Sequence, residues 1–243
     1  MLTSLSQGPN PWRLEDAEFK KITDDYVSRM SNVAAQLLRY VSMSLGLDAD
    51  YLEKRFAEEP IQYCGINMYP PFDKNDNDSV YGVGAHTDLG FLTLLQQDHH
   101  GGLEIFDIVQ DKWVEVPPLE DYFVINIGDM LEKWTHGIFI ATLHRVNNKN
   151  FNDMRISLPF FYEPDGKVTL ECIPKTMLSD DLLKVGEENT LKMRSSSEKR
   201  WDGKDLNEYD ANQTYNDFLI QKYQPAHPHL QEIFKDHPLA LKK

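Results

Sequence analysis

The sequence predicts a mainly β domain with flanking helices, built as a β-sandwich or jelly roll. Two observations support this prediction. Apolar residues repeat at helical spacing near the start of the chain, and about eight short runs rich in Val, Ile, Leu, Phe and Tyr follow Pro60. Turn clusters such as PPFDKNDND and QDHHGG separate these runs. Many short strands joined by such turns are typical of sandwiches and jelly rolls.

The chain is expected to begin with helices. Over residues 22–45 apolar side chains recur at intervals of one, three and four positions, which is the period of one helix face. Gly46 is suited to end this helix in the left-handed conformation, and Asp48 to cap a short second helix that runs toward Phe56. We therefore expect residues 1–59 to form a helical lead-in.

A jelly-roll core is expected over residues 60–172, followed by a polar and helical tail over 173–243. In the tail, residues 195–212 are predicted to form a surface loop and 214–223 a terminal helix. No linker divides the chain, so one domain is expected over 1–243. The predicted strands are 62–69, 84–96, 102–106, 112–116, 123–127, 144–147, 155–162 and 168–171.

Composition excludes several classes of protein. A hydrophobic fraction of 41% without a long uninterrupted apolar stretch indicates a soluble protein rather than a membrane span. The first residues lack the features of a secretory signal, so a cytoplasmic location is expected. A formal charge of −14 repels nucleic acid and anionic membranes, which leaves a small molecule as the expected partner. Cys64 and Cys172 are too few for a disulfide scaffold and are expected to be free and buried.

Three residues are candidate metal ligands. His86 and Asp88 are two positions apart in a predicted strand, so their side chains are expected on one face. His144 opens a later strand that a jelly roll can bring opposite them. Two imidazoles and one carboxylate leave positions open for a cosubstrate and O₂ on Fe(II). An H-x-D pair alone is weak evidence, because a surface pair has the same spacing.

A candidate anion site follows eleven residues after His144. Arg155 and Ser157 are expected on one face of a strand, where the guanidinium can bind a carboxylate bidentately and the hydroxyl can add a hydrogen bond. A buried arginine in the apolar run RISLPFF requires an anionic partner. The alternative is an internal salt bridge with one of the many acidic residues.

Taken together, the motifs resemble the isopenicillin N synthase-like family of Fe(II)/2-oxoglutarate dioxygenases. Their order and spacing agree with that family over roughly residues 60–165, and the combination is more specific than any one motif. The matching segments are NMYPP (67–71), GAHTDLGFLTLLQQD (84–98), GGLEI (101–105), WVEVPP (113–118), VINIGDMLEKWTHG (124–137), LHRV (143–146) and RISLPFF (155–161).

The resemblance implies a double-stranded β-helix with Fe(II) on the two histidines and the aspartate named above. It also implies that 2-oxoglutarate chelates the iron through its keto end and places its far carboxylate on Arg155 and Ser157. Tyr69 is implied as a further contact of the cosubstrate, and Asn67 as a polar neighbour. The implied reaction is the hydroxylation or desaturation of a small organic molecule, with release of succinate and CO₂.

Two other functions stay open. A 2-oxoglutarate-independent iron oxidase of the same fold would use Arg155 and Ser157 for the carboxylate of its own substrate. A truncated, non-catalytic member is the second alternative, because the family usually carries a longer segment ahead of the stretch that begins here at Gly8. Such a loss would leave an uncovered sheet edge, so oligomerisation or marginal stability is expected.

The remaining candidate residues are expected to be structural. His136 stands where many relatives have Asn, and it is expected to be structural or solvent-facing. Core packing explains Leu103, Trp134 and Phe161 at least as well as pocket lining does. Five other histidines are expected to have no metal role, the first two of them exposed: His99, His100, His227, His229 and His237.

Overall fold

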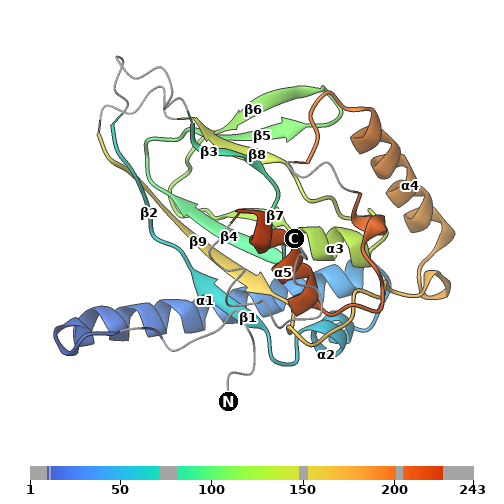
Figure 1. Ribbon diagram of the computed structural model, residues 1–243, viewed down its shortest axis with the longest axis horizontal. Helices are drawn as coiled ribbons and strands as arrows, with labels where there is room; N and C mark the ends of the chain where they lie inside the picture. The colour runs from blue at the N-terminus through green and yellow to red at the C-terminus, as the bar shows by residue number, and fades with distance from the viewer. Residues whose placement is uncertain (1–9, 11, 72–80, 148–152, 201–204, 227–243) are drawn as a thin grey trace.

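The computed structural model describes residues 10, 12–71, 81–147, 153–200 and 205–226. Two antiparallel sheets lie one above the other, with one long helix beneath the larger sheet and the other helices on one side of the strands (Figure 1). The larger sheet has the order β1-β9-β4-β7, with β2 also paired to β9, and the smaller has the order β3-β8-β5-β6. The strands are β1 (Ile61–Cys64), β2 (Asn67–Tyr69), β3 (Tyr81–His86), β4 (Leu92–Gln97), β5 (Leu103–Asp107), β6 (Lys112–Val116), β7 (Val124–Ile127), β8 (His144–Asn147) and β9 (Arg155–Glu163).

The helices come from both ends of the chain and from one insertion between strands. The long α1 crosses under β1, β4 and β9, which places it on the outer face of the larger sheet (Figure 1). The helices are α1 (Ala17–Ser44), α2 (Tyr51–Phe56), α3 (Asp129–Trp134), α4 (Asp180–Ser195) and α5 (Tyr215–Ala226), with short 3-10 turns at Leu14–Asp16, Lys175–Met177 and Leu206–Glu208. Within the described part of the chain, no helix combines the length and apolar character that a membrane crossing requires.

One hydrophobic core joins the start, middle and end of the chain. Leu38 of α1, Phe160 of β9, Trp134 of α3 and Phe218 of α5 are all fully buried members of it. The ring of Phe56 stacks on Trp134 with 3.9 Å between ring centroids. Truncating a core aromatic residue of this kind typically costs about 3–5 kcal/mol. The helices are therefore part of the same folded unit as the sheets.

The predicted fold class is confirmed, but three strand predictions were wrong. The run 62–69 is divided into β1 and β2, which both pair with β9. The run 84–96 is also two strands, and these belong to different sheets, because the chain leaves β3 after His86 and enters β4 at Leu92. Residues 168–171 form no strand; Thr169 makes an isolated bridge to Thr214.

The helix predictions were correct in kind and less accurate at their ends. α1 begins at Ala17, five residues earlier than predicted, and Gly46 follows it with the expected left-handed φ of 76°. Asp48 does not cap α2, whose N-cap residue is Asp50. The predicted surface loop 195–212 is not confined to the surface, because Leu206 is 4% exposed and the Arg200 side chain 10% exposed.

Candidate functional site

His86 and His144 lie side by side on neighbouring strands of the smaller sheet. They are register partners of β3 and β8, and their ring centroids are 4.2 Å apart. Nδ1 of His86 lies 2.9 Å from the carbonyl oxygen of Gly84, and Nδ1 of His144 lies 3.0 Å from that of Thr142. Because a carbonyl oxygen can only accept, each Nδ1 carries the ring proton. Each Nε2 therefore keeps a lone pair for a ligand.

Asp88 completes this group from a loop, not from a strand. The prediction that strand alternation places it beside His86 was therefore wrong in its reason, although the two side chains do converge. Oδ1 of Asp88 lies 4.0 Å from Nε2 of His86 and 3.8 Å from Nε2 of His144, which is too far for hydrogen bonds. Asn126 of β7 donates to Oδ2 of Asp88 at 3.2 Å. One ligand atom from each of the three residues lies within 4.8 Å of the others.

The chemistry of this group fits a metal ion. Two ring nitrogens without protons and one carboxylate oxygen point toward the same space, and such electron-rich atoms repel one another unless a cation lies between them. Burial lowers the pKa of His86 and its neighbour His144 lowers it further, against the opposing effect of Asp88, so the ring stays neutral and able to ligate. Two imidazoles and one carboxylate are the donor set that suits Fe(II) in oxygenases.

The loop that carries Asp88 is held by close backbone packing. The N–H of Asp129, at the start of α3, donates to the carbonyl oxygen of Asp88 at 2.8 Å, and the N–H of Met130 donates to that of Gly90. A Cβ atom at Gly128 would come within 2.2 Å of the Gly90 carbonyl oxygen. The two chain segments can therefore approach this closely only because glycine occupies position 128.

The candidate anion site lies on regular strands of the larger sheet. Asn67 pairs with Ser157 and Tyr69 with Arg155 in the register of β2 and β9. Strand alternation therefore places all four side chains on one face, as predicted for Arg155 and Ser157. Ile156, between the latter two, points the other way and is 40% exposed.

Arg155 is fully buried, and neutral groups hold its guanidinium. Its Nε donates to the carbonyl oxygen of Gly101 at 2.6 Å and its Nη2 to Oε1 of Gln97 at 3.2 Å, while the guanidinium lies 4.8 Å from the ring centroid of Tyr69. Burial lowers the pKa of Arg155, and the nearby Tyr69 and Asp98 oppose this. Because arginine begins from a very high pKa, the side chain keeps its charge near neutral pH.

Three of the six other histidines lie in the described part of the chain. His136 is structural, since its Nε2 lies 2.7 Å from the carbonyl oxygen of Ile173. His99 is exposed as predicted, whereas His100 is not: its side chain is 17% exposed and lies 3.1 Å from Asp98. Three histidines of the tail lie outside the described residues: His227, His229 and His237.

The predicted packing roles and cysteine states can also be compared with the structure. Leu103 and Trp134 are buried in the interior, as core packing requires. Phe161 is half-buried and stacks on Tyr63 with 4.5 Å between ring centroids. Cys64 and Cys172 are free but half-buried rather than buried, and burial raises the pKa of both thiols.

Sequence reasoning missed several residues that support these sites. Asn126 gave a weak signal, as a polar residue in the apolar strand VINI. Gln97 and Gly101 gave none, because their contacts with Arg155 span more than fifty residues of sequence. Arg200 also gave none, since it lies in a run of charged and polar residues typical of an exposed loop.

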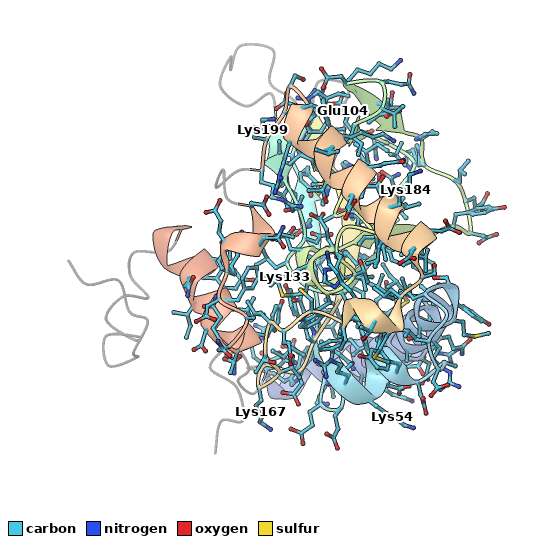
Figure 2. The ribbon with its side chains drawn as sticks, turned by 90° about the vertical axis from the view of Figure 1, so that its right-hand side faces the viewer. Lys54, Glu104, Lys133, Lys167, Lys184 and Lys199 are labelled. Carbon is cyan, nitrogen blue, oxygen red and sulfur yellow. The ribbon has the colours of Figure 1, made fainter. Side chains whose placement is uncertain are left out.

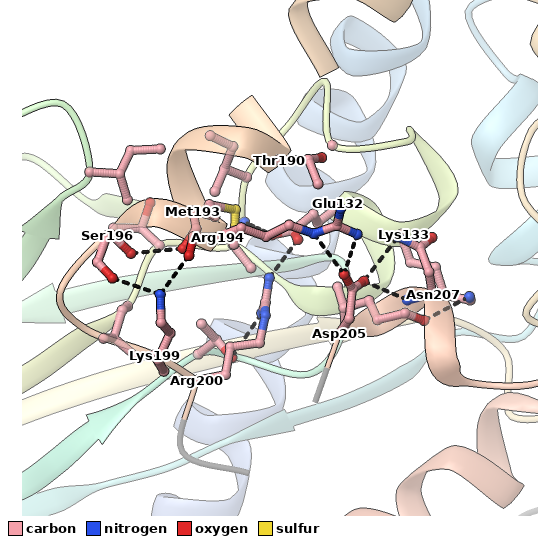
Figure 3. A pocket seen from close by; sticks show the side chains of 18 of the residues that line it. Glu132, Lys133, Thr190, Met193, Arg194, Ser196, Lys199, Arg200, Asp205 and Asn207 are labelled. Carbon is pink, nitrogen blue, oxygen red and sulfur yellow. Dashed lines mark hydrogen bonds and ion pairs between the residues drawn. The ribbon is translucent and has the colours of Figure 1, made fainter. Parts of the chain in front are cut away.

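A cavity of about 460 Å³ lies beside the candidate metal ligands, but His86, Asp88 and His144 do not line it. Its walls include residues of α3 and α4 and of the stretches 196–200 and 205–207, as Figure 3 shows. Lys133 lines it and lies in the middle of the molecule in Figure 2, where its Nζ donates to the carbonyl oxygen of Leu206 at 2.9 Å. Thr87 also lines the cavity, whereas its neighbours His86 and Asp88 do not. Thr87 therefore marks the boundary between the cavity and the candidate metal site.

The known proteins that this chain resembles include Fe(II)-dependent oxygenases. The model of the 2OG-Fe(II) oxygenase superfamily matches residues 60–164. A 1-aminocyclopropane-1-carboxylate oxidase of Dictyostelium mucoroides is 31% identical over an alignment of 231 positions, which covers 84% of this chain and 59% of that protein. The chain therefore spans about three fifths of the length of this relative.

Solved structures show the same fold. A full-length Neurospora crassa protein in complex with alpha-KG superimposes with a TM-score of 0.69 at 23% identity, covering 89% of this chain and 62% of that one. The dioxygenase for auxin oxidation 1 from Arabidopsis thaliana, in its complex with 2-oxoglutarate, gives a TM-score of 0.57 at 30% identity, covering 68% and 59% of the two chains.

Proposed function

We propose that this chain, which belongs to the 2OG-Fe(II) oxygenase superfamily, oxidises a small organic molecule with O₂ and 2-oxoglutarate and releases succinate and CO₂. Within that superfamily we place it in the isopenicillin N synthase-like group, on the motifs of residues 67–161. One observation carries the proposal. Two imidazoles that both keep their protons on Nδ1 turn their Nε2 atoms toward the carboxylate of Asp88.

His86, Asp88 and His144 are the proposed ligands of Fe(II). When bound, the metal supplies the activation of O₂ that oxidation of a C–H bond requires. The chain contributes the geometry of the ligands. The carbonyl oxygens of Gly84 and Thr142 fix the two imidazole rings, and Asn126 fixes the carboxylate through its second oxygen. Hydrogen bonds of this kind raise the affinity of a metal site by holding its ligands ready.

Arg155 and Ser157 are the proposed anchor for the far carboxylate of 2-oxoglutarate, with Tyr69 and Asn67 beside them. Support comes from the shared face of these four residues and from the buried positive charge of Arg155. A guanidinium fork in a dry environment binds a carboxylate strongly and in one orientation. With its far carboxylate on this anchor, the cosubstrate would keep its keto end free to bind the metal.

The substrate is proposed to bind beside Asp88 at the other end of β9. Phe161 lies on the same face of β9 as Arg155 and Ser157 and stacks on Tyr63, whose side chain is partly exposed. The Tyr63 hydroxyl donates to Glu163, and burial raises its pKa, with smaller contributions from the charges of Glu163 and Asp88, so we propose that this stacked pair lies on the side of the metal ligands. We also propose that residues 1–243 work as one domain, because α1 and α5 share their core with the sheets.

The test is an anaerobic titration of the Fe(II)-loaded protein with 2-oxoglutarate. A bidentate keto-acid chelate gives a weak visible metal-to-ligand band, and we expect this band in the wild type and not in Arg155→Ala at the same ligand concentration. Arg194→Ala removes an arginine whose ion pair is largely exposed, and it is expected to keep the band. Iron binding without a band would favour the 2-oxoglutarate-independent oxidase, as would substrate oxidation without stoichiometric succinate. Failure to bind Fe(II) would contradict the proposal as a whole.

A further inference from the structure

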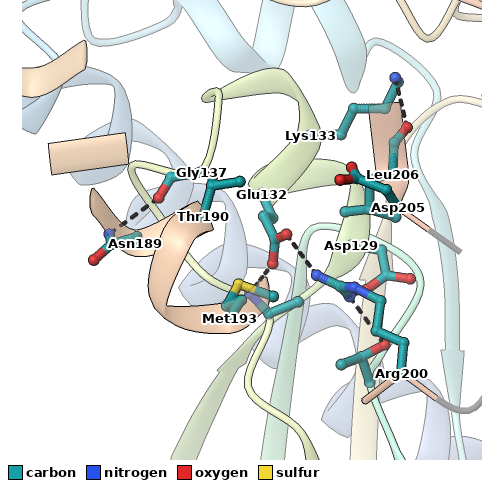
Figure 4. A network of polar contacts seen from close by, with 12 residues as sticks. Asp129, Glu132, Lys133, Gly137, Asn189, Thr190, Met193, Arg200, Asp205 and Leu206 are labelled. Carbon is teal, nitrogen blue, oxygen red and sulfur yellow. Dashed lines mark hydrogen bonds and ion pairs between the residues drawn. The ribbon is translucent and has the colours of Figure 1, made fainter. Parts of the chain in front are cut away.

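Arg200 places a buried guanidinium between the elements that carry the proposed metal ligands. It follows α4, and only 10% of its side chain is exposed. Its Nη1 atom donates to Asp129 and, at 3.3 Å, to Oγ1 of Thr87, and its Nη2 atom pairs with Glu132 at 2.5 Å. Figure 4 shows the guanidinium directed toward Asp129 and Glu132 of α3.

Each of these three partners leads directly to a segment that carries a ligand. Thr87 lies between His86 and Asp88 in the sequence. The backbone N–H of Asp129 donates to the carbonyl oxygen of Asp88 at 2.8 Å. The second carboxylate oxygen of Glu132 accepts from the N–H of Ala141 at 2.7 Å, three residues before His144. One side chain therefore connects both segments.

The residues that precede Arg200 are fixed to the smaller sheet. The N–H of Ser197 donates to Asp111 at 2.8 Å, and the indole N–H of Trp113, in β6, donates to Glu198 at 3.1 Å. The Nζ of Lys199 donates to the carbonyl oxygen of Ser196 at 2.6 Å. Segment 196–200 therefore runs from the β5–β6 hairpin to the loop of Asp88, and Arg200 reaches the loop from a fixed base.

The charges around Arg200 explain why it matters at this position. Asp129 is fully buried and Glu132 is 9% exposed, so their negative charges are costly without a cation nearby. Lys222 of α5 lies 3.9 Å from Asp129, and Arg200 contacts both acids. Burial raises the pKa of Glu132, and the charge of Arg200 opposes this.

We propose that Arg200 is a positioning residue for the metal centre, which holds the His86–Asp88 loop and the segment before His144 at a fixed separation. This inference rests on the proposed function, because it takes these residues as the Fe(II) ligands. The segment after α4, which the sequence predicts to be only a surface loop, would therefore have a role at the metal centre.

The test compares Fe(II) affinity with stability in Arg200→Gln and Arg200→Lys. Affinity is measured anaerobically by competition with a chromogenic chelator, and the melting temperature is measured on the metal-free protein. We expect Arg200→Gln to weaken Fe(II) binding about 10- to 100-fold, the usual effect of losing a group that orients a ligand. Arg200→Lys is expected to recover the melting temperature but not the affinity, because an ammonium cannot reproduce the planar fork that meets all three partners.

Arg194→Gln is the matched control, since Arg194 lines the same cavity and pairs with Asp205 at 2.7 Å but contacts no ligand segment. It is expected to bind Fe(II) like the wild type. Wild-type affinity in folded Arg200→Gln would overturn the inference and leave the proposed function intact, whereas a wild type that binds no Fe(II) would overturn both. If Arg200→Gln does not fold, Thr87→Val decides: it removes one hydrogen bond of Arg200, and an affinity that does not fall by several-fold would overturn the inference.

Discussion

The two halves of the candidate site are built in different ways. The anion half lies on β2 and β9, where Arg155 and Ser157 share a face because regular strands alternate. The metal half is irregular: His86 ends one strand, His144 begins another, and Asp88 lies in the loop that crosses between the sheets. Its geometry depends on contacts with residues far away in the sequence, such as Asn126 and Arg200.

This difference has a physical cause. An anion with two oxygens can be held by side chains that project from one flat surface. A metal ion with three protein ligands needs donors that converge on a point from different directions, and a single strand cannot supply them. A crossing loop can, but a loop has few hydrogen bonds of its own and must be held from outside. The two halves should therefore respond differently to substitution.

The largest expected effect is that of Asp88→Ala, which removes the carboxylate from the metal half. We expect Fe(II) binding and oxidation activity to fall below detection. The melting temperature of the metal-free protein should stay the same or rise, because without a cation the carboxylate of Asp88 repels the lone pairs on Nε2 of His86 and His144. Chelator competition and thermal melts measure the two quantities.

The control for this substitution is Asp181→Ala, which removes an exposed carboxylate of α4. It should leave Fe(II) binding unchanged. Full turnover by Asp88→Ala would show that the ligand assignment is wrong, whatever the effect on stability.

Arg155→Ala is the corresponding change in the anion half, and its effect should be confined there. Losing one partner of a buried charge pair costs about 2–5 kcal/mol, so 2-oxoglutarate binding should weaken by about 30-fold or more. Fe(II) affinity should stay within about two-fold of the wild type. Titrations with each ligand check both expectations, and a parallel loss of Fe(II) affinity would show that the two halves are not independent.

Glu163 offers a third test, because it lies on the regular strand β9 but beside the metal half. Tyr63 and Tyr215 donate to its carboxylate. Burial raises its pKa to about 8, and the charge of Asp88 contributes. In the unfolded chain the pKa returns to about 4.3. Between these two values the folded protein holds a proton that the unfolded chain releases, so the free energy of unfolding falls as the pH rises through this window and is constant above it.

Glu163→Gln removes this titration and should flatten the pH dependence of stability. In the metal-free protein, the free energy of unfolding of the variant relative to that of the wild type is expected to rise by about a few kcal/mol between about pH 5 and about pH 8.5. Urea unfolding at both pH values measures the difference. An equal difference at the two values would mean that the carboxyl is already ionised at the lower pH in the folded state.

The sequence predicts regular parts of the structure better than irregular ones. The face shared by Arg155 and Ser157 follows from alternation, and the same rule failed for His86 and Asp88 because the predicted strand 84–96 is broken where the chain changes sheets. No local pattern marks that break, which depends on the packing of Gly90 against Gly128. The burial of Arg200 was equally hidden, because a charged run is typical of a surface and only the folded chain brings two acids of α3 to it.

The smallest expected effect is that of Ser157→Ala. A single hydroxyl that donates to a carboxylate already held by Arg155 contributes about 1 kcal/mol, so 2-oxoglutarate should bind about five-fold more weakly, with Fe(II) affinity and melting temperature unchanged. Ser157 is 3% exposed and its Cα lies opposite both Asn67 and Gln97 in the sheet, so the hydroxyl points into the same interior as the guanidinium. If Ser157→Ala weakened binding as much as Arg155→Ala, the carboxylate would be held by the hydroxyl side of this face. The anion would then still bind on the face that strand alternation predicts. The buried charge of Arg155, however, would have a structural role between β2 and β9 and would not bind the carboxylate.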